Sequence, residues 1–355
     1  MGTDMVKQIL SLGVALAGFF TINTSAASSE QPVTVLQLEN NNIAFKATPD
    51  IGGRVLSFSL LNRANFLKLS EEVKANPNPV VSAEAHNIGY FGHEMWVGPQ
   101  SAWWTQQTMN AERRAAKAIW PPDPYLILAK NQILQQDEKI LSLKSPESPI
   151  TGVQLTKTYR LIDEAPNSIA LDVQARNIRK EKIQWDIWFN TRVDQDTLAY
   201  VPVANADDIR VSHLTNNKIA PLTYTLENKI FSLDVTPPPE GKAIRRGKIF
   251  IQPSAGWIAA FKGDQAFVIQ FAHQSPDVIH PEQGQVELYH DYQPEDPKNG
   301  LLELEVHAPY VTLAPGEVMD ASERWTVLPY TGEPTRAAHI EFLQESAVRL
   351  GLDGF

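Results

Sequence analysis

The sequence predicts an all-β protein, a large antiparallel β-sandwich with a C-terminal helix. More than a dozen short segments alternate apolar and polar residues with the two-residue period of a strand. Turn residues separate these segments, and the chain holds 25 prolines and 19 glycines. Because strands do not alternate with helical segments, a parallel α/β fold is disfavoured.

The predicted strands run through the whole chain, beginning with a hairpin around an Asn-rich turn. The clearest ones span residues 33–38, 43–48, 52–61, 152–162, 168–176, 183–194, 256–263, 266–274, 284–292, 301–308 and 319–328. Most of them place apolar side chains on one face, as a strand packed on a core requires, whereas 256–263 and 266–274 have the pattern of a buried pair around Gly263-Asp264.

Two segments have a helical pattern. The first, residues 111–119, ends before Pro121-Pro122. The second, residues 334–352, carries one apolar stripe and should pack on the outside of the sandwich. Residues 235–247 are the most loop-like part and are interpreted as an excursion within a single domain.

The N-terminus has the features of a signal peptide. Lys7 precedes the apolar run 9–20, and small residues suited to cleavage follow at Ala26 and Ala27. The alternative is a buried helix of the fold. We expect a signal peptide over 1–26, one domain over 27–355, and a periplasmic or secreted location. No other window is long and apolar enough for a membrane span.

Composition excludes several functions. The net charge of −10 and pI near 5.3 disfavour nucleic acid and anionic lipid. The absence of cysteine excludes disulfides and thiolate chemistry. Phosphate-loop, zinc-helix and serine-nucleophile motifs are also absent, so no cofactor and no metal is expected. The oligomeric state stays open.

Strand 183–194 raises the first question about a site. One face is apolar, whereas the other carries amide, acid, aromatic and guanidinium groups that include Trp188, Asn190 and Arg192. That face is either a concave binding surface or an outer surface with its tryptophan covered by a loop, since alternation does not tell which face is open.

Strands 284–292 and 301–308 show a related pattern. Glu303, Glu305 and His307 share one face, and Glu287 shares a face with Tyr289. Carboxylates at alternate positions suit an acid–base site on a sheet, although any solvated strand shows them too.

Four of the eight tryptophans lie between Gly92 and Tyr125: Trp96, Trp103, Trp104 and Trp120. A sugar-binding loop would have this composition, because aromatic rings pack on the C–H faces of sugars and residues such as His93, Glu94 and Gln100 bond hydroxyls. The alternative is a satellite core beneath a loop. We expect Trp120 to be structural and at least one of the other three to lie at a groove.

Several short motifs, in order, resemble galactose mutarotase-like proteins and a bacterial family grouped with them. They are Gly52-Gly53-Arg54, Trp96…Pro99-Gln100, Trp120-Pro121-Pro122, Leu304-Glu305 with His307, and Pro315-Gly316-Glu317…Trp325. The resemblance covers nearly all of the mature chain. It implies a β-sandwich with a sugar-binding groove on its concave face.

The resemblance also implies roles for particular residues. Glu305 matches the glutamate that takes the anomeric hydroxyl proton in aldose epimerases. The family's histidine is missing, because Thr191 follows Asn190, and His93 is the candidate acid instead. The expected carbohydrate-binding residues are Arg54, Trp96, Gln100, Trp103, Trp188, Asn190, Arg192, Glu287 and Glu303.

Three functions follow from these observations. The first is an epimerase-like enzyme acting on a sugar through Glu305. The second is a non-catalytic periplasmic carbohydrate-binding protein, and the third is a structural protein with a closed groove. An acid across a pocket from Glu305 would favour the first, and its absence would favour the second.

Overall fold

The computed structural model describes residues 32–213 and 216–355. Residues Pro32–Phe355 form one compact unit. The expected signal peptide, 1–26, lies outside the described residues. Within them, no helix is long and apolar enough to cross a membrane.

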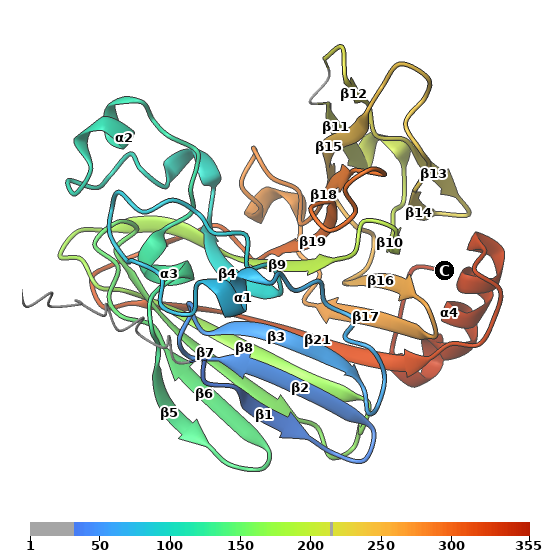
Figure 1. Ribbon diagram of the computed structural model, residues 1–355, viewed down its shortest axis with the longest axis horizontal. Coiled ribbons are helices and arrows are strands. Elements are labelled where there is room, and N and C mark those ends of the chain that lie inside the picture. The colour runs from blue at the N-terminus through green and yellow to red at the C-terminus, as the bar shows by residue number, and fades with distance from the viewer. Residues whose placement is uncertain (1–31, 214–215) are drawn as a thin grey trace, which may run out of the picture. The chain divides into compact units, whose positions relative to one another are not determined.

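Two large sheets form the molecule, and the predicted all-β sandwich is confirmed (Figure 1). The first has eleven strands in the order β1-β2-β3-β4-β9-β19-β18-β15-β11, with β12 beside β15 and β20 beside β9. These are β1 Leu36–Glu39, β2 Ile43–Thr48, β3 Arg54–Leu60, β4 His93–Gly98, β9 Ile183–Val193, β11 Ile209–His213, β12 Ile219–Ala220, β15 Ile244–Ile251, β18 Val286–Tyr292, β19 Leu301–His307 and β20 Val311–Leu313.

The second sheet has ten strands in the order β13-β14-β10-β16-β17-β21-β8-β7-β6-β5. These are β5 Gln132–Gln136, β6 Ile140–Lys144, β7 Val153–Leu161, β8 Ser168–Asn177, β10 Leu198–Pro202, β13 Tyr224–Glu227, β14 Ile230–Leu233, β16 Trp257–Lys262, β17 Gln265–Phe271 and β21 Val318–Pro329. Among the described pairs only β12 with β15 is parallel.

The core lies between the sheets and is rich in aromatic rings. Phe58 of β3 meets Phe267 of β17 and Trp325 of β21, with ring centroids 5.6 Å apart in both pairs. These three rings are fully buried. Removing such a ring typically costs about 3–5 kcal/mol, so they anchor the first sheet on the second.

Between residue 32 and the C-terminus, as far as the structure describes it, helices are few and short, apart from the last. They are α1 Glu72–Ala75, α2 Ala111–Ala115, α3 Pro124–Ile127 and α4 Arg336–Leu350, with 3-10 turns at Gln100–Ala102, Ala206–Asp208 and Pro276–Val278. The predicted helix 111–119 is shorter than expected, because Lys117 adopts a φ of +47° that a right-handed helix cannot accommodate.

The predicted C-terminal helix is present as α4, coloured red beside β16 and β17 (Figure 1). Thr335 caps its first turn, and Gly351 ends it at a φ of +69°. Leu343 and Leu350 join Tyr200 and Phe261 in a second apolar cluster, which therefore lies outside the main core.

Candidate functional site

The face of the first sheet that points away from the core carries rows of polar side chains. Strand register places Ser212, Lys248, Tyr289, Glu303 and Arg192 in one row across β11, β15, β18, β19 and β9. Directly opposed residues share a face of a sheet. The sequence separates these residues by up to 111 positions, and antiparallel pairing brings them side by side.

The adjacent row is more buried. It contains Phe250, Glu287, Glu305, Asn190 and Glu94, on β15, β18, β19, β9 and β4. Beside it, His307 faces Trp188, which faces Trp96. Glu305 and Asn190 thus point to the same side of the sandwich, as a shared site requires.

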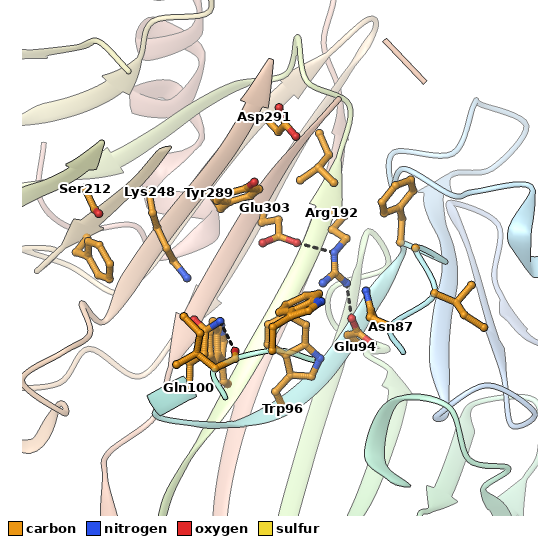
Figure 2. Close-up of a pocket in the computed structure, with 18 residues that line it drawn as sticks. Asn87, Glu94, Trp96, Gln100, Arg192, Ser212, Lys248, Tyr289, Asp291 and Glu303 are labelled. Carbon is orange, nitrogen blue, oxygen red and sulfur yellow. Dashed lines mark hydrogen bonds and ion pairs between the residues drawn. The ribbon is translucent and has the colours of Figure 1, made fainter. Parts of the chain in front are cut away.

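A pocket of about 580 Å³ opens over this face. Its wall includes Glu94, Trp96, Gln100, Trp120, Trp188, Arg192, Ser212, Lys248, Phe250, Tyr289, Asp291 and Glu303. Figure 2 shows Lys248, Tyr289 and Glu303 on neighbouring strands, with Arg192 between Glu303 and Glu94. Predicted sugar-binding residues on the wall are Trp96, Gln100, Trp188, Arg192 and Glu303.

Arg192 is held in place by two carboxylates. Its Nε donates to Glu303 at 2.7 Å and its Nη1 donates to Glu94 at 2.6 Å. Arg54, fully buried behind the wall, also pairs with Glu94. Burial acts to raise the pKa of Glu94, but the two guanidinium groups outweigh it and lower this pKa. Glu94 is therefore an ionised anchor for both arginines.

Glu305 lies beneath the pocket wall. Its Oε2 accepts hydrogen bonds from Trp188 Nε1 and Lys248 Nζ, both at 2.8 Å. Burial, with the neighbouring Glu303 and Glu287, raises the pKa of Glu305 despite Lys248. Because Glu305 is fully buried and is not a wall residue, Trp188 and Lys248 separate its carboxyl group from a ligand in the pocket.

Glu287 and His307 complete the buried cluster. Lys248 Nζ lies 2.6 Å from Glu287 Oε2, and His307 Nδ1 lies 3.1 Å from Asp186 Oδ2 and 2.9 Å from Gln283 Nε2. Burial alone would lower the pKa of His307, but Glu287 and Asp186 raise it to about 9. Lys248 and His307 in turn overcome burial and lower the pKa of Glu287.

His93, the predicted acid, is not part of this cluster. It faces Thr191 across β4 and β9, and its ring lies 4.8 Å from Trp325 of the second sheet. Adjacent strand residues point to opposite faces, so Glu94 reaches the polar face and His93 enters the core. Burial also lowers the pKa of His93 well below its usual value. The prediction that His93 is the acid opposite Glu305 is therefore corrected, because His93 lies in the core.

The tryptophans differ from expectation in one respect. Trp120, expected to be structural, is 49% exposed and lies on the pocket wall. Trp103 and Trp104 are buried, with Trp103 stacked on Trp188 at 5.7 Å. The Trp-rich segment thus adds Trp103 and Trp104 to the main core and presents two rings to the pocket, Trp96 and Trp120.

Other predicted residues have supporting positions. Three residues, Arg54, Asn190 and Glu287, are buried on the polar side of the sheet but do not line the pocket. Trp103 is also buried and stacks on Trp188. Sequence reasoning missed Lys248, which bridges two carboxylates. Lys248 occupies alternate positions of β15 with Arg246 and Phe250, so the three residues share one face of the strand. This two-residue spacing was the signal in the sequence that could have identified Lys248.

A family model named Domain of unknown function (DUF4380) matches residues 33–328, and the chain belongs to this family. A search of curated proteins found no match. The solved structures that are similar include the Slr1438 protein of Synechocystis sp. PCC 6803, at 11% identity and a TM-score of 0.51, with 84% of this chain and 97% of that chain covered.

Two further similar structures differ in coverage. A TPR-domain containing protein from Parabacteroides distasonis has 15% identity and a TM-score of 0.50, over 85% of this chain and 48% of that one. A putative aldose 1-epimerase from Escherichia coli K12 has 13% identity and a TM-score of 0.48, over 84% and 99%. Galactose mutarotase-like descriptions recur among the matches, and the likeness is one of fold alone.

Proposed function

We propose that this protein binds carbohydrate in the pocket over the first sheet, without chemical conversion, and that it does so after export. The observation that carries the proposal is the half-exposed indole of Trp120 on the same wall as Glu303, Asp291 and Tyr289. An exposed ring can cover the C–H face of a sugar, while the carboxylates and the phenol bond its hydroxyl groups.

Fixed orientation of the polar groups supports this reading. Arg192 is held between two carboxylates, and Lys248 is held by Glu287 and Glu305. A pocket whose polar groups are already ordered loses less entropy when a ligand binds. Positive and negative groups are mixed on the wall, which suits a neutral ligand better than a strongly charged one.

The position of Glu305 favours binding over epimerisation through that residue. A general base needs hydrogen-bond reach to the proton it takes, and Trp188 with Lys248 occupies the exposed side of Glu305. The expected partner, His93, lies on the other face of the sheet.

Sugar epimerisation by another pair is the second candidate. Glu303 and Tyr289 face each other across β19 and β18, and both are wall residues. Burial and Asp291 raise the pKa of Tyr289 to about 12, so this phenol keeps its proton at neutral pH. A carboxylate beside a protonated phenol is a possible base and acid.

The test is calorimetric titration with a panel of neutral mono- and oligosaccharides. A sugar that binds the wild type should lose at least about tenfold in affinity with Trp120→Ala, since a tryptophan that anchors a ligand commonly contributes more than about 1.4 kcal/mol. Phe355→Ala is the matched control, because Phe355 is an exposed aromatic outside the wall. Absence of saturable binding, or equal affinity in Trp120→Ala, would refute the proposal.

Polarimetry on the bound sugar separates the two candidates. If anomer interconversion is accelerated and Glu303→Gln abolishes the acceleration, the epimerase assignment replaces the binding one. For export, the mass of the chain recovered from an expressing bacterium should correspond to cleavage after Ala26 or Ala27. An intact N-terminus in the recovered chain would contradict export.

A further inference from the structure

We propose that Glu287, Glu305 and His307 form a binding site for one divalent transition-metal ion beneath the pocket. Glu287 and Glu305 face each other across β18 and β19, and His307 follows Glu305 on the same face. One possible ligand atom from each of the three lies within 4.8 Å of the other two. This site is separate from the sugar-contacting wall and does not depend on the proposed function.

The spacing of the ligand atoms fits a metal. His307 Nε2 lies 3.5 Å from Glu287 Oε1. Two ligands bonded at about 2.1 Å to a tetrahedral metal lie roughly 3.4 Å apart. No large movement of β18 or β19 is therefore required for these two groups to bind one ion.

Two of the three ligand atoms lack a hydrogen bond, although His307 Nε2 lies at ion-pair distance from Glu287. Glu305 Oε1 and His307 Nε2 are buried, and neither has a hydrogen-bond partner among the described residues. An unsatisfied buried polar atom typically costs about 1–3 kcal/mol, so such atoms usually have a partner in native proteins. An ion bound to both would supply it.

The surroundings hold the ligands in a metal-binding arrangement. Asp186 Oδ2 lies 3.1 Å from His307 Nδ1, and a carboxylate that accepts the Nδ1 proton directs the Nε2 lone pair to a metal. Lys248 pairs with the Oε2 atom of each of the two glutamates, so both Oε1 atoms stay available to bind an ion. Glu287 Oε1 accepts one bond, from the Gly284 amide at 3.0 Å, and keeps a second lone pair.

A divalent cation that displaces the protons of Glu305 and His307 would also leave the cluster balanced in charge. With their carboxyl groups ionised, Asp186, Glu287 and Glu305 carry three negative charges, and Lys248 offsets one. One divalent ion bound to a neutral imidazole balances the remaining two. One nitrogen and two carboxylate oxygens suit zinc or manganese, whereas calcium and magnesium prefer all-oxygen sites.

The test begins with the whole chain, produced in zinc-supplemented medium and desalted. Elemental analysis should find about one zinc per chain. Anomalous diffraction at the zinc edge should place it about 2.0–2.2 Å from Glu287, Glu305 and His307. Manganese at the same three ligands would also support the site and would identify the preferred ion.

Variants provide the second measurement. Glu305→Gln and His307→Gln should each lower the zinc content at least tenfold. Glu303→Gln, on the same strand and face but bonded to Arg192, should retain it. If the two ligand variants do not fold, the anomalous map of the wild type decides alone.

Three results would overturn the proposal: less than about a tenth of an ion per wild-type chain, zinc content unchanged in both ligand variants, or an anomalous peak elsewhere. None of them would affect the carbohydrate proposal, whose test depends on Trp120.

Discussion

The indole of Trp188 donates its Nε1 hydrogen to Glu305 Oε2 at 2.8 Å, across neighbouring strands. Trp188 lies on the pocket wall and Glu305 lies below it, so this bond joins the binding surface to the buried charge cluster. Glu305, the residue that matches the aldose epimerase glutamate, is thus hydrogen-bonded to a wall residue, a contact that the sequence alone does not reveal.

Trp188→Phe removes this donor and keeps a ring in place. At pH 9, above the value of about 8 to which burial raises the pKa of Glu305, we expect a loss of about 1.5–3 kcal/mol in the free energy of unfolding, because the lost bond then goes to a carboxylate. Trp185→Phe is the control, since Trp185 is also buried and donates to the neutral Thr151 carbonyl at 2.9 Å. Urea denaturation should show the larger loss for Trp188→Phe, and equal losses would contradict the charged-acceptor argument.

Lys248→Met leaves two buried carboxylates without their shared cation. Removing one partner of a buried ion pair typically costs about 3–5 kcal/mol. Lys139→Met is the comparison, because Lys139 pairs with Asp163 at 2.7 Å on the exposed surface, where such pairs contribute less than about 1 kcal/mol. Chemical denaturation of both variants tests the contrast, and a loss below about 1 kcal/mol for Lys248→Met would refute it.

Glu323→Gln should change the pH dependence of stability. Burial raises the pKa of Glu323 to about 8, from 4.5 in a free chain, despite the bond from Trp325. Between these values the folded state binds the proton and the unfolded state does not, so stability falls as pH rises. The variant should gain stability over wild type at pH 8 and little at pH 4. Melting temperatures across this range measure it, and a pH-independent difference would contradict the assignment.

Lys157 should make stability depend on pH in the opposite direction. This lysine of β7 is fully buried, with Nζ 2.5 Å from the Gly52 carbonyl oxygen, and burial lowers its pKa to about 7 from 10.5. Between pH 7 and 10.5 the unfolded state binds the extra proton, so stability rises with pH. Lys157→Met should flatten this rise. Denaturation midpoints at pH 7 and pH 9.5 test it, with Lys139→Met as an exposed control.

The sequence was sufficient for the fold because alternation is repeated many times. Segments such as 168–176 and 301–308 show which residues face the core, and their strands have these faces in the structure. The end of α2 was less predictable. Residues 111–119 contain good helix formers, but the left-handed backbone at Lys117 depends on tertiary contacts that propensity does not include.

At the site, the sequence predicts which face of the sheet each side chain occupies, but it does not predict which residues of other strands lie beside it. Alternation puts Asn190 and Arg192 on one face and Thr191 on the other, as observed. Only strand order tells that Lys248 lies against Glu287 and Glu305, because 39 and 57 residues separate it from them. Exposure of Trp120 likewise depends on how the loop folds back, which local sequence does not encode.

The unequal burial of the tryptophans provides an optical probe. Seven of the eight are buried, and Trp120 alone is half exposed on the pocket wall. Collisional quenchers such as iodide reach only exposed indoles, so the quenchable part of the fluorescence should come from Trp120. A sugar stacked on that ring would shield it from the quencher. Occupancy of the pocket can therefore be followed by the quenching of tryptophan fluorescence in the wild-type chain, without a label.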